Sequence, residues 1–540
     1  ASDVAGAGGP VAGVIELEGL VDRVVDLPVA AGRLTDLRAT AGGLVWRSLP
    51  PEGNLGVGRT DPDAQPAKAK LEHLDLATGK VVTLVDGADG VEVTAGGAAL
   101  VVSKDGGLRL VPADRPATPD GDDAFDVDLQ RILLTVDPAE EWPQMYEESA
   151  RLMKERYWVE DMAGIDWDAV VARYRPIADR ISSRDELHDL LWELFGETGT
   201  SHAYVWSGPE RPPANQRVGH LGADIESGPD GWRVASVPAT EPSVPLARSP
   251  LQAALVGVGD VIDTIDGCPV DPLTGPGPLL VGAAGRVVEL GVRREGGERR
   301  TVAVVPLEDE RPLRYHAWVA GRRAAVRERS DGRLGYVHVP DMMSEGWAEL
   351  NRDLLVETSF DGLVADFRHN RGGHTSQLVL ERLSGVVSAW SNPRGFEAES
   401  YPTDAPRGPL VALCNQYAGS DGDIVSEGFR HRGLGPLVGT RTWGGVIGID
   451  MRYGLADGTV VTQPSYSFWF VDEGWEVENH GVSPDVEVQI APQDWAAGRD
   501  PQIEVAVDLA LAALEERPPA RPPRRDDRPS RAAPELPPRP

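Results

Sequence analysis

The sequence has few residues of the kinds that build disulfide frameworks and metal centres. Its 540 residues include two cysteines, Cys268 and Cys414, and neither belongs to a CxxC pair. We interpret both as buried small apolar residues. The motifs HExxH and GxxxxGK[ST] are absent, as is a glycine fingerprint between a strand and a helix. These absences argue against a metal, nucleotide or dinucleotide enzyme, so we expect no cofactor and no metal ligands.

Lysine is also scarce, and no basic surface is indicated. Five of the 53 basic residues are lysine, whereas 85 residues are acidic, so the net charge is −32. We expect no nucleic-acid partner, because phosphate contacts need clustered Lys and Arg. No apolar run approaches the roughly 18 residues that span a bilayer, and no secretory signal is visible. We therefore predict a cytoplasmic protein without a membrane partner.

The chain is longer than the size of about 250–300 residues at which single cores stop growing, so we expect several domains. Residues 10–115, within a first domain expected at 1–116, alternate short apolar and polar runs, and Asp75–Lys80 has the D-L-x-T-G-K pattern of a turn within a propeller blade. The strands expected there are Val14–Leu17, Leu44–Ser48, Ala69–Leu76, Val81–Val85, Ala99–Ser103 and Leu108–Val111. About two blades fit, and the first residue is not Met, so we expect missing upstream sequence. A small sandwich is the alternative.

A helical block and a β-rich block follow. Residues 117–215 begin with a polar linker, 117–137, and Ser183 is placed to cap a helix. The helices expected there are Glu140–Arg156, Trp167–Arg180 and Arg184–Phe195. Residues 216–310 have β-patterning around Gly257–Ile262. A small, partly open barrel of this kind leaves a groove in which an extended peptide can add as a strand.

Strands alternate with helices in residues 311–516, which favours a layered α/β domain with parallel strands. The expected strands are Leu334–Val339, Gly362–Phe367 and Leu410–Cys414, and the expected helices are Glu345–Val356, Ser376–Leu383, 421–431 and Ile503–Glu515. Residues 517–540 include nine prolines, a density that helix interiors and central strands do not accept. We predict a disordered tail there.

One strand–turn–helix segment favours a serine nucleophile. Ser420 lies between a strand and a helix, where the unpaired N–H groups of the first helical turn suit a developing oxyanion; a plain helix N-cap is the alternative. The glycine turn Arg368–Gly373 follows another strand and is either a second oxyanion donor or an ordinary turn. His202, in a loop after a helix, is a candidate base, and a structural histidine is the alternative. One of the acids in residues 472–482 would orient the base.

Four motifs occur in the order found in one peptidase family. They are GTSHAYV at 199–205, DFRHNRGG at 366–373, NQYAGSDGD at 415–423 and ENHGVSPDVEV at 478–488. With these motifs, and a PDZ-like block between the first two, the chain resembles the tricorn-type serine peptidases. The resemblance implies four successive domains: the last blades of a β-propeller, a helical C1 domain, a PDZ-like domain and an α/β catalytic domain of ClpP/crotonase-like fold.

The resemblance also assigns roles to single side chains. Ser420 matches the nucleophile and His202 the general base. Ser201 and Glu478 match the pair that orients and polarises the histidine, with Glu476 as a less favoured alternative to Glu478. Such a tetrad would form an acyl-enzyme, which water then hydrolyses.

The remaining inferred site residues concern the oxyanion and the substrate. The backbone N–H groups of Asp421 and Gly372 match the oxyanion hole, and Gly373 is a nearby alternative to Gly372. Ser391 stands where the archetype of the family has an aspartate that favours basic side chains before the cleaved bond. The resemblance therefore marks Ser391 as a specificity position without giving a cleavage preference.

The function implied is that of a cytoplasmic serine peptidase for oligopeptides released by the proteasome, acting as a homohexamer with aminopeptidases as partners. The alternative is a non-catalytic PDZ-containing scaffold on the same fold. Retention of Ser201, His202, Ser420 and Glu478 favours catalysis. Processing peptidases of the same clan use a Ser–Lys pair, and the absence of lysine after Lys154 excludes that mechanism.

Overall fold

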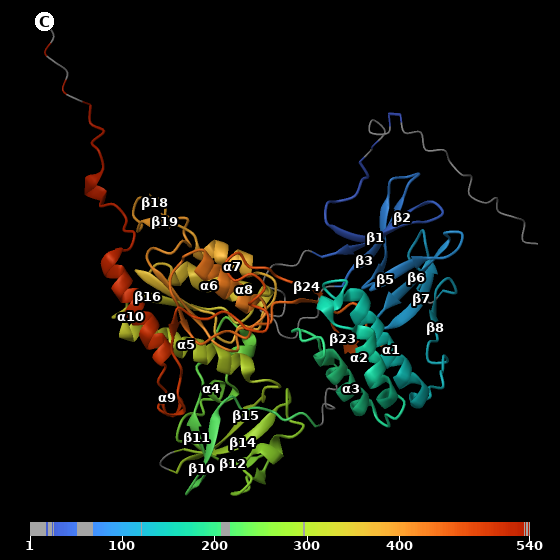
Figure 1. The fold of residues 1–540 in the computed structure, drawn as a ribbon, viewed down its shortest axis with the longest axis horizontal. Helices are drawn as coiled ribbons and strands as arrows, with labels where there is room; N and C mark the ends of the chain where they lie inside the picture. Colours follow the sequence, from blue (N-terminus) through green and yellow to red (C-terminus); the bar gives the residue numbers. More distant parts are fainter. Residues whose placement is uncertain are drawn as a thin grey trace, which may run out of the picture. The chain divides into compact units, whose positions relative to one another are not determined.

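The computed structural model describes residues 26–50, 68–119, 121–206, 216–294 and 297–533, together with residues 18, 19, 24, 535 and 538. The chain divides into two compact units, residues 1–53 with 63–135 and residues 54–62 with 136–540. Figure 1 shows their elements, coloured along the sequence. In the described part of the chain, no helix combines the length and the apolar character needed to cross a bilayer.

The first unit contains two antiparallel sheets, each with the four-stranded meander form of a propeller blade. The strands are β1 (Arg33–Ala39), β2 (Gly43–Leu49), β3 (Lys70–Asp75), β4 (Val81–Asp86), β5 (Gly90–Val93), β6 (Ala99–Lys104), β7 (Gly107–Pro112) and β8 (Phe125–Val127). Their inward side chains form one core that includes Val45, Leu71 and Leu100. β8 corrects the interpretation of 117–137 as a linker, because its backbone pairs with β7. The predicted strand Val14–Leu17 lies outside the described residues.

The second unit begins with three helices that confirm the predicted helical block. They are α1 (Pro138–Arg156), α2 (Trp167–Ala178) and α3 (Arg184–Gly196). Their apolar faces meet in one core around Met145, Tyr146 and Leu191. Ser183 caps α3 as predicted, since its hydroxyl accepts the N–H of Glu186. Helix α3 ends at Gly196, six residues before His202.

The β-rich block forms an antiparallel sheet of order β10-β11-β12-β14-β15, with β13 pairing with β12. Its elements are β10 (Asp224–Gly228), β11 (Gly231–Ser236), η4 (Pro245–Ala247), α4 (Pro250–Ala253), β12 (Val261–Ile265), β13 (Cys268–Pro269), η5 (Gly277–Leu280), β14 (Val288–Arg293) and β15 (Arg299–Val304). Cys268 is exposed at the start of β13, which corrects the expectation that both cysteines are buried. Both residues of β13 are exposed, whereas Cys414 is buried in the strand Leu410–Cys414.

The remaining chain forms the predicted α/β domain around a parallel sheet of order β16-β17-β20-β21-β25. The strands are β16 (Leu334–His338), β17 (Gly362–Asp366), β20 (Leu410–Cys414), β21 (Leu437–Gly439) and β25 (Val486–Glu487). The helices are α5 (Arg311–Arg329), α6 (Ser344–Glu357), α7 (Ser376–Leu383), α8 (Asp421–His431), α9 (Pro492–Ala496) and α10 (Pro501–Glu516). Helices α6, α7 and α8 cover one face of the sheet, and α5 and α10 cover the other (Figure 1). The loops after β16, β17 and β20 therefore share the carboxyl edge, where open α/β sheets place their ligands.

Short elements complete the second unit. They are η2 (Met162–Gly164), β9 (Val205–Trp206), β18 (Ala389–Ser391), β19 (Glu399–Tyr401), β22 (Gly448–Asp450), β23 (Val460–Val461), β24 (Gln463–Tyr466) and η6 (Arg525–Asp527). β9 pairs with β23, so the segment after His202 is held against the catalytic domain. In the tail, Ala520 N–H donates to the Arg407 carbonyl over 2.7 Å. Disorder of residues 517–540 stays a prediction.

Candidate active site

Ser420 occupies a strained turn between β20 and α8. Its backbone has φ 58° and ψ −119°, a combination that side chains other than glycine seldom adopt. It stands at the N-cap position of α8, yet its side chain makes no capping hydrogen bond. The plain N-cap alternative therefore does not describe this serine. A strained strand-to-helix turn that leaves the hydroxyl free is the geometry of a nucleophile elbow.

Two neighbouring segments hold this turn in place. Gly419 N–H donates to the Asn370 carbonyl over 3.0 Å, and Trp443 N–H donates to the Ala418 carbonyl over 2.9 Å. A Cβ atom on Gly419 would lie 2.7 Å from the Trp443 ring, so only glycine fits there. The strain at Ser420 is thus maintained by contacts on both sides of it.

The two glycines of the Arg368–Gly373 turn have different surroundings. The N–H of Gly372 donates to Asn370 Oδ1 over 2.9 Å, and this glycine is buried. Gly373 is exposed and lines the same cavity as Ser420 and Asp421, and its N–H makes no hydrogen bond among the described residues. The N–H of Asp421 is equally unpaired. This geometry favours Gly373, the alternative, over Gly372, the first choice from the sequence, as the candidate second oxyanion donor.

His202, Ser201 and Glu478 form a continuous hydrogen-bond chain. Ser201 Oγ lies 2.9 Å from His202 Nδ1 and donates to Glu478 Oε2 over 3.1 Å. The Ser201 N–H also donates to Glu478 Oε1 over 2.7 Å. Because a carboxylate only accepts, the serine hydroxyl donates to Glu478 and accepts from Nδ1–H, which leaves Nε2 as the basic nitrogen. Glu476, the alternative, is exposed, and the carboxylate that Ser201 contacts is that of Glu478.

The segment Trp443–Ile447 contacts both the Glu478–Ser201–His202 hydrogen-bond chain and the turn that carries Ser420. The Trp443 ring meets the His202 ring edge to face, with centroids 5.3 Å apart, and also packs against Gly419. Glu478 Oε2 accepts the N–H of Val446 over 2.8 Å, and Val446 lines the same cavity as Ser420. No direct hydrogen bond joins His202 to Ser420 in the described residues, as is common before substrate binds.

Burial adjusts the acidity of His202. The side chain is 8% exposed, and desolvation lowers the pKa of the imidazole below its usual value, while the charge of Glu478 raises it. The neutral, basic form is therefore present at neutral pH. Thr462 holds the backbone here, accepting the Tyr204 N–H over 2.7 Å.

Glu478→Gln is expected to lower kcat for peptide hydrolysis by about 10- to 100-fold, the worth of one charge-assisted hydrogen bond. It should also move the acid limb of the kcat/KM pH profile to lower pH, because the carboxylate that raises the His202 pKa is gone. Glu476→Gln is the matched control, since that side chain is exposed and lies two residues away. An equal loss in both variants would contradict the assignment of Glu478.

A cavity of about 480 Å3 opens beside Ser420. Its walls are mainly apolar and aromatic, and they include Leu380, Ile424, Phe468, Trp469 and Phe470. Such a pocket suits a side chain of a bound peptide, next to a serine and two unpaired N–H groups. Ser391 does not line it, because β18 and β19 form a separate two-stranded ribbon.

Three family models match successive parts of the chain. The Tricorn protease C1 domain matches residues 138–196, the Tricorn protease PDZ domain matches residues 219–309, and Peptidase family S41 matches residues 333–488. The chain belongs to the tricorn protease family. The predicted order of C1, PDZ and catalytic domains is thereby confirmed.

Relatives in the tricorn protease family are similar over most of this chain. Tricorn protease homolog 1 of Streptomyces coelicolor is 54% identical over 515 residues, which are 94% of this chain and 48% of that protein. Tricorn protease of Thermoplasma acidophilum is 37% identical over 451 residues, 83% of this chain and 42% of that protein. The crystal structure of the tricorn protease matches with a TM-score of 0.83 and 35% identity, covering 91% of this chain and 47% of that one. The chain thus spans about half the length of these tricorn proteins.

One important side chain of this tricorn site was not found from the sequence. Asp423 is fully buried in α8 and accepts hydrogen bonds from Thr442 Oγ1 and from the N–H groups of Gly444 and Gly445. Burial raises the pKa of Asp423 to about 6, against the effect of these donors. Asp423 therefore fixes the segment that places Trp443 against His202. In a sequence, an acid in the first turn of a helix is expected simply to interact with the helix dipole. No local pattern therefore predicts that Asp423 holds the segment Thr442–Gly445.

Proposed function

We propose that this chain carries out serine-type hydrolysis of peptide bonds through an acyl-enzyme. The observation that supports this most is the hydrogen-bond chain from Glu478 through Ser201 to His202. It is accompanied by the strained backbone of Ser420, whose side chain makes no capping hydrogen bond to α8. Ser420 Oγ attacks the peptide carbonyl while His202 Nε2 accepts its proton. His202 then donates that proton to the leaving amine, and a water molecule hydrolyses the acyl group.

The oxyanion of this reaction would lie between the N–H groups of Asp421 and Gly373. Neither N–H group makes a hydrogen bond within the described residues, and both residues line the cavity that contains Ser420. The first belongs to a helix N-terminus, where the helix dipole adds to the stabilisation of negative charge. We assign the apolar cavity to a substrate side chain, and we retain Ser391 as a proposed specificity position on the β18–β19 ribbon.

The proposal extends to the biological setting that the family resemblance implies. The substrates would be oligopeptides released by the proteasome, and the whole protein would act in the cytoplasm as a homohexamer, with aminopeptidases completing the degradation. The relatives are named as tricorn proteases, which supports a peptide substrate. This chain covers about half the length of the Streptomyces coelicolor relative.

Fluorogenic oligopeptides with different side chains before the reporter test the proposed activity. We expect time-dependent release of the reporter. Treating the protein with a fluorophosphonate before the assay should abolish this release, since such reagents modify activated serines. The scaffold alternative expects peptide binding without release. Binding without any cleavage by the well-folded chain would therefore reject the peptidase proposal.

A further inference from the structure

A second cavity lies on the same carboxyl edge of the sheet, away from Ser420. Its volume is about 620 Å3, within the range of about 300–1,000 Å3 that is usual for small-molecule sites. It is partly open and is lined by η4 of the PDZ domain, by α5 and α6, and by the loops that follow β16 and β17. Ser420 and Gly373 do not line it, so it is distinct from the catalytic pocket.

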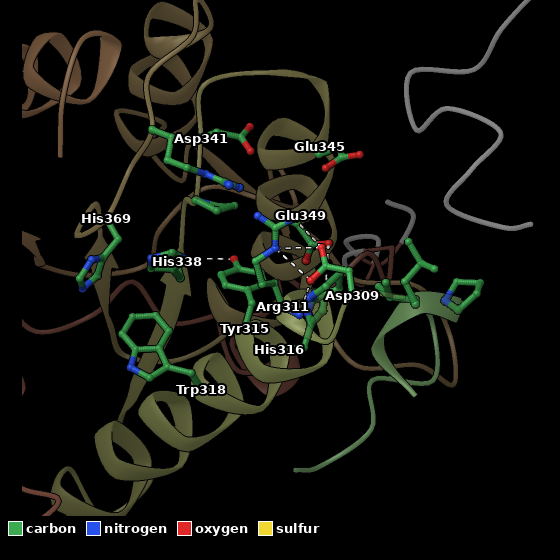
Figure 2. A pocket seen from close by; sticks show the side chains of 16 residues that line it. Asp309, Arg311, Tyr315, His316, Trp318, His338, Asp341, Glu345, Glu349 and His369 are labelled. Carbon is green, nitrogen blue, oxygen red and sulfur yellow. Dashed lines mark hydrogen bonds and ion pairs between the residues drawn. The ribbon is translucent and has the colours of Figure 1, made fainter. Parts of the chain in front are cut away.

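Several charged side chains of this cavity already have partners within the protein. Asp309 is paired with Arg311, and Glu349 is hydrogen-bonded to the guanidinium of Arg352. The dashed lines of Figure 2 mark the bonds between Asp309 and Arg311. These pairs neutralise one another and leave no reason for a ligand to bind there.

Three other charges in the cavity are not neutralised. Asp341 is 4% exposed, and its Oδ1 accepts the N–H groups of Met343 and Gly346, while Oδ2 has no hydrogen bond among the described residues. Glu345 and Arg371 are exposed, and neither has a side-chain hydrogen bond or ion pair in the described part of the chain. Unpaired charges of both signs on the lining of one cavity are complementary to a ligand that also carries both.

The rest of the lining is aromatic and apolar. Figure 2 shows Asp341 and Glu345 on one side of the cavity and Tyr315 and Trp318 on the opposite side. The Tyr315 hydroxyl lies 3.0 Å from His338 Nδ1, and His338 Nε2 donates to the Arg368 carbonyl over 2.9 Å. These polar atoms are satisfied internally, so this wall presents rings to an occupant. Leu246 of η4, 47% exposed, extends the apolar surface.

We propose that this cavity binds a short peptide with both ends free. The ammonium group faces Asp341 and Glu345, the carboxylate faces Arg371, and an apolar side chain lies between Leu246 and the rings of Tyr315 and Trp318. Peptides of this class have one positive and one negative end, which matches the unpaired charges.

Calorimetric titration of the Ser420→Ala chain with the tripeptide Ala-Leu-Ala tests this site without cleavage. Glu345→Gln in that background is expected to weaken binding of the free tripeptide about tenfold, and not to change binding of its N-acetylated form. Arg371→Gln is expected to weaken the free tripeptide about tenfold, and not to change its C-terminal amide. Both replaced side chains lack partners, so both variants should fold.

Glu397→Gln is the matched control, because Glu397 is an exposed acid in the loop before β19 and lies outside the cavity lining. It should leave every affinity unchanged. No measurable binding of the free tripeptide overturns the proposal, and so does binding that Glu345→Gln and Arg371→Gln leave unaltered. The result is independent of the proposed peptidase activity, since all titrations use a chain without the Ser420 hydroxyl.

Discussion

Ser420→Ala is expected to reduce kcat for peptide hydrolysis by about 10³-fold or more. The variant removes the Ser420 hydroxyl, which shares a cavity with the candidate oxyanion donors Asp421 and Gly373, so no acyl-enzyme forms. KM should change little, because the apolar walls of the cavity remain. Steady-state kinetics with the best fluorogenic peptide measure both constants.

Ser426→Ala is the matched control for that variant. Ser426 is a serine of the same helix, fully buried, with its hydroxyl bonded to the Gly422 carbonyl over 2.8 Å. Its loss removes one internal hydrogen bond, worth about 1 kcal/mol, and leaves the site intact. The assignment of Ser420 fails if Ser420→Ala cleaves as fast as the Ser426→Ala chain.

His202→Gln is expected to have an effect of similar size, about 10³-fold in kcat, because glutamine cannot accept the serine proton. The acid limb of the pH profile should disappear together with the titrating imidazole. In the unaltered chain this limb should lie below pH 6.5, since burial lowers the His202 pKa from its usual value of about 6.5.

His188→Gln provides the comparison for His202. His188 is on α3, and its Nε2 lies 3.1 Å from Thr459 Oγ1, so it has a structural bond of its own. Its replacement should leave the pH profile unchanged. Retention of the acid limb in His202→Gln would show that another group acts as the base.

Elements with strong local signals were predicted well from the sequence. The helices α3, α7 and α8 have caps or continuous periodicity, and β20 is an uninterrupted apolar run that is buried along its whole length. Helix α5 was not predicted. It has an Arg-rich sequence and buries only Leu313, His316, Val319 and Val326, so its apolar pattern is weak, and packing against β16 and α10 stabilises it.

The site could be predicted only as far as side-chain identity goes. The motifs identified Ser201, His202, Ser420 and Glu478, and the structure joins the first two to the last by hydrogen bonds. Choosing between Gly372 and Gly373 was not possible, because that choice depends on where the Asn370 amide lies after folding. A sequence motif does not indicate which of two neighbouring backbone N–H groups is left without a hydrogen bond after folding.

Mass spectrometric mapping of a fluorophosphonate adduct tests the serine–histidine chemistry at the reacting atom. We expect one modified serine, Ser420, in the folded chain, and strong loss of that adduct in His202→Gln. A folded chain that remains unmodified at Ser420, or that is modified equally with and without His202, would contradict the proposed serine–histidine chemistry.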